Sequence, residues 1–167
     1  MTSTTKPEKC AEVREEIDRL NADAKTADKF MEGITRVLHE KMLKYNWVGF
    51  YMLERGAQEP VLLLGPYQGA MTPHTRIPLH QGICGAAAST GRTVVVDDVS
   101  KDSRYLACSI ETKSEIVVPV FAHGDVVGEL DIDSHFPAAF GEEDRDLVEY
   151  CAHLVGKRLE TEGKTRS

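Results

Sequence analysis

The sequence lacks a long hydrophobic run, a signal-peptide core and any excess of positive charge. No apolar stretch approaches the ~20 residues that a membrane-spanning helix requires, and residues 1–9 are polar. Lys and Arg number 20 against 27 Asp and Glu, which gives a net charge of −7 and a field that repels phosphate backbones and anionic lipid. We therefore expect a cytoplasmic protein that binds neither nucleic acid nor a membrane.

Several motifs of common enzyme classes are also missing. The chain has no Gly-rich phosphate loop, no Gly-x-Ser-x-Gly elbow and no Cys-x-x-Cys pair, which argues against nucleotide-loop, α/β-hydrolase and thioredoxin-type chemistry. Its six histidines form no pair at helical ligand spacing. A metal site built from His74, His80 and Cys84 would cross a proline and a turn, so surface histidines are the simpler interpretation and we expect no metal.

The 167 residues, 41% of them hydrophobic, fit a single domain. Apolar periodicity predicts helices over residues 8–20, 27–43 and 140–159 and a short helix over 81–91. Two antiparallel hairpins are predicted, one over residues 47–53 and 61–64 and one over 115–121 and 126–132, with residues 65–69 leaving the sheet. Because the hairpins make an antiparallel sheet that terminal helices can cover, the predicted class is α+β.

Four cysteines are spread widely along the chain, which does not suggest a secreted disulfide scaffold. Cys108 lies in a predicted loop, where it is either a reachable thiol or a small hydrophobic residue under the loop. Cys84 lies at a helix start that favours a thiolate, or packs among neighbouring alanines. Cys10 and Cys151 lie on apolar helix stripes and are interpreted as packing residues. The stripe with Cys10 itself fits either an intersubunit seam or the core.

Acidic and aromatic residues mark one face of the predicted sheet. Asp131 and Asp133 alternate along the end of a strand, and Glu115 begins its hairpin partner. Gathered carboxylates repel each other unless they share a proton or a cation, although solvated strand-end acids are an alternative. Trp47 and Tyr51 are four residues apart on one strand and therefore share a face, either in the core or as a pocket wall.

A series of motifs resembles the free methionine-(R)-sulfoxide reductases, a catalytic branch of the GAF-domain family. The motifs, in chain order, are NWVGFY (46–51), LGPYQG (64–69), RIP (76–78), GICG (82–85), DDV (97–99), Cys108, SEIVVP (114–119) and LDIDS (130–134). The resemblance spans residues 27–159. It implies a GAF-like fold, with a central antiparallel sheet of about six strands, terminal helices on one face and a loop-covered pocket on the other.

The resemblance also implies roles for individual residues. Cys108 matches the attacking cysteine and Cys84 a partner cysteine. Where the best-known members have a further cysteine, this chain has His74, so a disulfide would have to join Cys84 and Cys108. The remaining matches are the acidic pocket residues and the aromatic wall of the family: Glu115, Asp131, Asp133, Trp47 and Tyr51.

The implied activity is the reduction of free methionine-(R)-sulfoxide through a sulfenic acid and an intramolecular disulfide, a defence against oxidative stress. The implied partners are thioredoxin, or a similar external dithiol, and a second copy of the chain in a homodimer; no cofactor is expected. The expected organisation is an N-terminal helical extension (1–20), one GAF domain (21–162) and a disordered tail (163–167). The alternative is a non-catalytic GAF module that binds or senses a small molecule.

Overall fold

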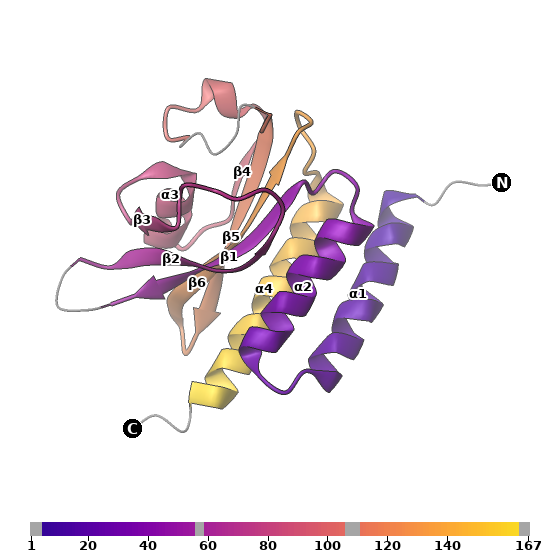
Figure 1. Ribbon diagram of the computed structural model, residues 1–167. Coiled ribbons are helices and arrows are strands. Elements are labelled where there is room, and N and C mark those ends of the chain that lie inside the picture. Colours follow the sequence, from indigo (N-terminus) through magenta and orange to yellow (C-terminus); the bar gives the residue numbers. More distant parts are fainter. Residues whose placement is uncertain (1–4, 56–58, 106–110, 164–167) are drawn as a thin grey trace.

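A computed structural model describes residues 5–55, 59–105 and 111–163 (Figure 1). The elements, in chain order, are α1 (Lys6–Asp23), α2 (Ala27–Lys41), β1 (Trp47–Glu54), β2 (Val61–Gln68), β3 (Arg76–Pro78), α3 (Gly82–Thr90), β4 (Val94–Val96), the 3-10 turn η1 (Val99–Lys101), β5 (Ser114–Ala122), β6 (Asp125–Ser134) and α4 (Glu142–Gly163). The strands form one six-stranded antiparallel sheet in the order β3-β2-β1-β6-β5-β4. The predicted α+β class is confirmed.

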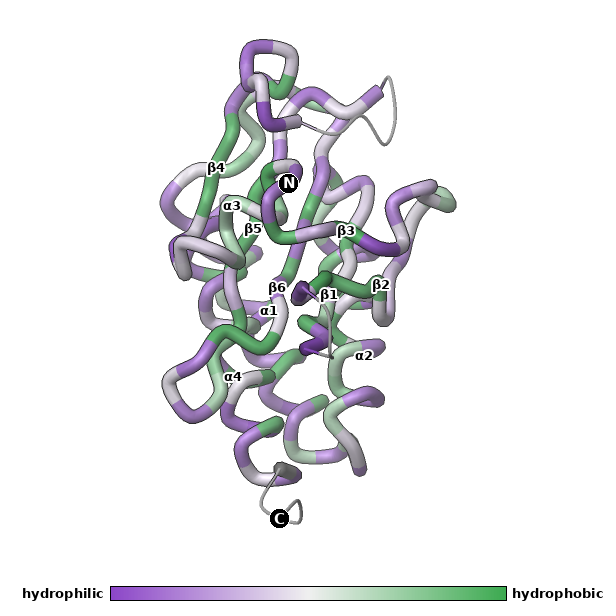
Figure 2. The backbone as a smooth tube through the Cα atoms, turned by 90° about the vertical axis from the view of Figure 1, so that its left-hand side faces the viewer, coloured by the Kyte–Doolittle hydropathy of each residue, from purple (hydrophilic) through white to green (hydrophobic). Residues whose placement is uncertain are grey.

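Helices α1, α2 and α4 form a layer beside the sheet (Figure 1). Thr5 and Thr26 start α1 and α2 as N-caps, since their hydroxyls accept hydrogen bonds from the amides of Glu8 and Lys29. Figure 2 shows apolar and polar segments alternating along these helices, the pattern of elements with one buried face. Their apolar faces join one face of the sheet in the larger core, which includes Phe30 and Ile132.

The apolar stripe of α1 lies in this core. Cys10, Val13 and Ile17 are buried against the same chain, so the core interpretation of the stripe is correct. The helix continues to Asp23, beyond the expected boundary at residue 20. Of the expected disordered tail, residue 163 ends α4 and residues 164–167 lie outside the described part of the chain.

Strand β2 is longer than predicted. The prediction that residues 65–69 leave the sheet is wrong for most of this segment, because β2 stays paired with β1 as far as Gln68. The register shifts at this point: Gly49 and Tyr51 of β1 face Tyr67 and Leu64, so β2 contributes an extra residue. A bulge of this kind accommodates Gly65 and Pro66 inside the strand. In the sequence, these two residues indicate the end of a strand instead.

The second face of the sheet carries α3 and a smaller core. That core includes Tyr51, Leu62, Ile83 and Val117. Both edge strands are short: β3 pairs only with residues 61–63 of β2, and β4 only with residues 115–117 of β5. Strand β2 therefore extends past β3, and β5 extends past β4. The part of each strand beyond its edge strand, called the overhang, contains a proline: Pro66 in β2 and Pro119 in β5.

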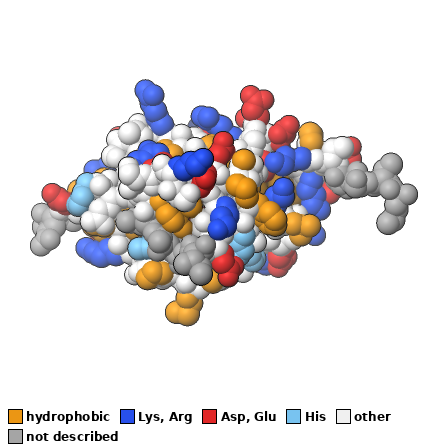
Figure 3. Space-filling model, turned by 90° about the horizontal axis from the view of Figure 1, so that it is seen from above, with side chains coloured by type: hydrophobic (Ala, Val, Ile, Leu, Met, Phe, Trp, Pro, Cys, Tyr) orange, Lys and Arg blue, Asp and Glu red, His pale blue; other side chains and the backbone are white. Residues whose placement is uncertain are grey.

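Positive and negative side chains are interspersed on the surface seen from above, although the chain has a net charge of −7 (Figure 3). Among the described residues, no helix has both the length and the apolar character needed to span a membrane.

Candidate active site

Three acidic residues alternate along β6, the strand between β1 and β5. Glu129, Asp131 and Asp133 share the face of the sheet opposite to the three-helix layer, because side chains of a strand alternate between its faces. Their exposed fractions are only 0%, 4% and 4%. Solvated strand-end acids, the alternative left open by the sequence, are therefore excluded.

Glu115 lies beside these acids on β5, where it pairs with Asp133, and it too is buried. Burial raises the pKa of Glu115 well above its usual range, and the charges of Asp131 and Asp133 raise it further. Burial also raises the pKa values of Asp131 and Asp133, while a hydrogen bond from Glu115 counteracts the rise in each. Burial and mutual charge repulsion therefore favour protonated forms within this group of acids.

Cys84 stands over this cluster from the first turn of α3. Its thiol donates a hydrogen bond to Oδ2 of Asp131 at 3.4 Å. Burial raises the pKa of Cys84 well above its usual value, and the charges of Asp131, Glu129 and Glu115 raise it further. The prediction that the helix start favours a thiolate is therefore wrong, since desolvation and nearby acids outweigh the free amides of the helix.

Trp47 and Tyr51 of β1 form the aromatic side of the site, opposite Asp133 and Glu129 in the strand register. The Trp47 indole stacks on Tyr67 with centroids 5.6 Å apart and donates from Nε1 to the carbonyl of Ala70 at 3.0 Å. A side chain at Gly49 would meet the Trp47 ring at 2.4 Å, so the glycine makes room for the indole. The Tyr51 hydroxyl donates to the carbonyl of His74 at 2.6 Å.

A small cavity of about 20 Å³ lies between these groups. It is lined by Tyr51, His74, Ile77, Gly82, Ile83, Cys84, Glu115 and Asp131. This volume corresponds to roughly one water molecule. This space is smaller than a free amino acid.

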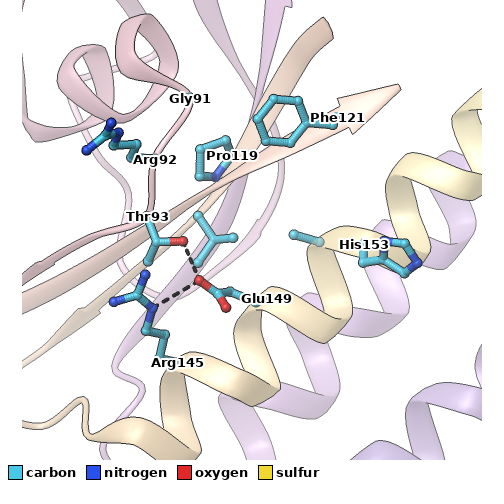
Figure 4. A pocket seen from close by; sticks show the side chains of 10 residues that line it. Gly91, Arg92, Thr93, Pro119, Phe121, Arg145, Glu149 and His153 are labelled. Atoms are coloured by element: carbon cyan, nitrogen blue, oxygen red, sulfur yellow. Dashed lines mark hydrogen bonds and ion pairs between the residues drawn. The ribbon is translucent and has the colours of Figure 1, made fainter. Parts of the chain in front are cut away.

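A larger hollow of the surface lies elsewhere. It measures about 600 Å³ between the end of α3, β5 and α4, and none of the predicted site residues lines it. In Figure 4, the Glu149 carboxylate accepts from the hydroxyl of Thr93 at 2.6 Å and from Nε of Arg145 at 3.0 Å, which occupies the polar groups on that side. This hollow therefore offers no group for redox chemistry.

The structure brings together the site residues that the sequence predicted within its described part: Trp47, Tyr51, Cys84, Glu115, Asp131 and Asp133. Cys108 lies outside the described residues. Cys10 and Cys151 are buried in the other core, as predicted. Glu129 was not predicted, although its spacing of two from Asp131 places it on the same face of β6. Burial raises the Glu129 pKa well above its usual value, and the charge of Asp131 raises it further.

Comparison with known families identifies the fold. A family model described as the GAF domain matches residues 26–159. The chain belongs to the GAF domain family. Its curved six-stranded antiparallel sheet with four helices is the GAF fold, as the resemblance implied.

Two curated relatives of this GAF domain share the same name. The free methionine-R-sulfoxide reductase of Saccharomyces cerevisiae is 42% identical over 113 residues, which cover 67% of this chain and 62% of that protein. The chain thus matches less than two thirds of the length of the yeast relative. The free methionine-R-sulfoxide reductase of Escherichia coli is 32% identical over 156 residues, which cover 93% of this chain and 92% of that protein.

Solved structures of proteins with the same name are also similar to this chain. The free methionine-R-sulfoxide reductase of Neisseria meningitidis, solved in complex with its substrate, superposes with a TM-score of 0.89 at 36% identity and covers 99% of this chain and 96% of its own. The type II enzyme of Thermoplasma acidophilum superposes with a TM-score of 0.75 at 39% identity, over 85% of this chain and 96% of its own. This GAF domain is therefore homologous to free methionine-R-sulfoxide reductases.

Proposed function

We propose that the chain reduces free L-methionine-(R)-sulfoxide to methionine. The observation that carries the proposal is the buried carboxyl cluster of Glu115, Asp131 and Asp133, which shares a face of the sheet with Trp47 and has the Cys84 thiol above it. Carboxylates suit the ammonium group of a free amino acid, and an aromatic wall suits the methyl end of its side chain. The names of the relatives agree with this substrate.

In the first chemical step, the Cys108 thiolate attacks the sulfoxide sulfur while a carboxyl of the cluster protonates the sulfoxide oxygen. The oxygen passes to Cys108, which becomes a sulfenic acid, and methionine leaves. The cysteine sulfur is oxidised by two electrons and the substrate sulfur is reduced by two. Support comes from the raised pKa values of Glu115 and Asp133, because burial favours the protonated forms that can donate a proton.

In the second step, Cys84 attacks the sulfenic acid. A disulfide forms between the two cysteine sulfurs, and the hydroxyl leaves as water after taking up a proton. The hydrogen bond from the Cys84 thiol to Asp131 supports this step, because the carboxylate accepts the thiol proton as the new bond forms. An external dithiol such as thioredoxin then reduces the disulfide by exchange. Neither a metal nor an organic cofactor takes part in these steps.

The proposal places the enzyme in the cytoplasm, where thioredoxin is available and oxidative stress produces free methionine sulfoxide. We also propose that two copies of the chain form a homodimer. The buried stripe of α1 is already used within one chain, so a second copy would have to pack on other surfaces.

The first test is turnover of free methionine-(R)-sulfoxide with dithiothreitol or thioredoxin. We expect turnover by the parent protein and by Cys151→Ser, a control in the other core, and a loss of at least about a hundredfold in Cys108→Ser, which lacks the nucleophile. The (S)-epimer and Nα-acetylated substrate should react poorly. No turnover by the parent would favour the non-catalytic small-molecule module instead.

A second test addresses the resolving role of Cys84. After one equivalent of sulfoxide, the intact mass of the parent should fall by two hydrogens as the disulfide forms. The same loss is expected for Cys10→Ser but not for Cys84→Ser, which should accumulate the Cys108 sulfenic acid. A disulfide that still forms in Cys84→Ser would assign the resolving role to another cysteine.

A further inference from the structure

Cys84, Glu115 and Asp131 carry groups that can bind a metal ion, and all three line the small pocket. One ligand atom from each of the three side chains lies within 4.8 Å of the other two. The three residues come from α3, β5 and β6, so they surround a common point rather than follow one element. All three side chains are buried, with exposed fractions of 4–5%.

A second observation points to a bound cation. Among the described residues, the buried side-chain oxygens without a hydrogen-bond partner are both oxygens of Glu129 and one oxygen each of Asp131 and Asp133. All belong to the acidic residues of β6, and Asp131 among them lines the cavity and is one of the three candidate ligands. An unpartnered buried polar group costs about 1–3 kcal/mol, and the protons that the acids share leave these lone pairs unused. A bound cation would provide a positive partner for these carboxylate oxygens.

The volume of the pocket and the type of its ligand atoms indicate which ion it binds. A cavity of about 20 Å³ accepts one ion but not an amino acid. The set of one thiolate and two carboxylates suits Zn²⁺, whose ligands lie at about 2.0–2.3 Å. Mg²⁺ and Ca²⁺ are hard cations that bind oxygen and therefore gain nothing from Cys84.

We propose that Cys84, Glu115 and Asp131 bind Zn²⁺ in this small pocket, and that the bound ion excludes the substrate. Glu129 provides negative charge beside the metal. On binding, the Cys84 proton is released to solvent and a sulfur–zinc bond replaces it, so no electrons are exchanged. The ion is an inhibitor and not a cofactor, because it occupies the resolving thiol and two of the acids that the reaction needs. This inhibitory role rests on the proposed function, whereas zinc binding itself does not.

Binding is tested on the reduced full-length protein after chelator treatment, with Zn²⁺ titrated against a chromophoric chelator. We expect one Zn²⁺ per chain, and at least about tenfold weaker binding in Cys84→Ser and in Asp131→Asn. Cys151→Ser is the matched control and should bind like the parent, since Cys151 lies in the other core. Equal binding by Cys84→Ser and the parent, or no binding by a folded parent, overturns the proposal.

A spectroscopic measurement separates ligation from a structural effect of the substitutions. Co²⁺ in place of Zn²⁺ should give a sulfur-to-metal charge-transfer band in the parent, and the band should disappear in Cys84→Ser while melting curves show that the variant is folded. If Cys84→Ser does not fold, the same comparison is made with Glu115→Gln, which should weaken binding but keep the band. A band that persists without Cys84 overturns the assignment.

Inhibition is measured separately, so that failure of the proposed function and failure of the metal site can be distinguished. If the parent turns over sulfoxide, Zn²⁺ should raise the apparent KM with little effect on kcat, and substrate should weaken Zn²⁺ binding in return. If the parent is inactive, the binding and Co²⁺ experiments still decide the metal site. Zinc binding without competition would overturn the inhibitory role alone.

Discussion

At the scale of single residues, the described cysteines differ in their surroundings more than in their solvent exposure. Cys84 stands over a cluster of acids, whereas Cys151 is packed among apolar groups of α4 and its neighbours. Burial raises the pKa of Cys151 to about 12, with the positive charge of Arg14 opposing the rise. The Cys84 thiol thus lies beside groups that can exchange a proton with it, whereas Cys151 acts as a small hydrophobic residue.

Cys151 should therefore resist alkylation in the folded protein. At pH 8 a thiol with a pKa of about 12 is ionised in about one molecule in ten thousand, and the thiolate is the reactive form. We expect peptide mass spectrometry to find Cys151 unmodified by N-ethylmaleimide at pH 8 in buffer and fully modified in denaturant. Labelling of Cys151 in buffer before any unfolding would contradict this assignment.

Which residues could be predicted depended on whether their role follows from local spacing. The alternation of Asp131 and Asp133 was sufficient to place both on one face of a strand. Glu129 follows the same spacing, but a lone acid in the middle of a strand is ordinarily solvent-facing, and nothing local shows that α3 covers it. The protonated state of Cys84 was not predictable either, because it depends on acids from two other elements.

At the scale of elements, α4 and β5 pack closely at one glycine. A Cβ atom at Gly156 would lie 2.1 Å from the backbone oxygen of Phe121, far inside contact distance. Gly33 of α2 differs, since a Cβ there would lie 3.1 Å from the flexible side chain of Leu20. Backbone cannot move aside as a side-chain tip can, so the two glycines should respond differently to the same substitution.

Gly156→Ala should lower the free energy of unfolding by about 1–3 kcal/mol, because overpacking outweighs the gain of about 0.5–1 kcal/mol in helix propensity. Gly33→Ala is the matched control and should be neutral or slightly stabilising. Urea unfolding followed by circular dichroism measures both. Equal effects of the two substitutions would show that α4 and β5 are less closely packed than described here.

Helices were easier to predict than strands for a physical reason. A period of three to four over many residues identifies a helix with a buried face, as in α2, whereas a short strand gives few repeats. The β2 bulge at Gly65 and Pro66 was missed because both residues usually end a strand. Only the pairing with β1 shows that they remain in the sheet.

At the scale of the whole molecule, α1 is part of the fold although the GAF family model begins only at residue 26. It is fixed to α4 at several points: Lys6 pairs with the buried Asp144, the Tyr150 hydroxyl donates to Asp18, and Arg14 lies over the Tyr150 ring at 4.7 Å. The buried face of α1 completes the larger core.

Ile17→Ala should therefore destabilise the protein as a central core substitution does. Ile17 is 0% exposed, and an Ile→Ala change at such a site costs about 2–5 kcal/mol. The exposed neighbour Arg19→Ala should cost less than about 0.5 kcal/mol. Thermal unfolding of both variants measures the difference. A small loss for Ile17→Ala would show that α1 is a peripheral extension, as the sequence predicts for residues 1–20.

The two prolines in the strand overhangs have a consequence for the protein in concentrated solution. Where β2 and β5 run past their short edge strands, they present backbone that an unfolded or neighbouring chain could extend into a larger sheet. Pro66 and Pro119 have no amide hydrogen, so each overhang lacks a donor that an incoming strand would need. Proline in an exposed edge segment disfavours the addition of another strand, an effect on aggregation rather than on turnover.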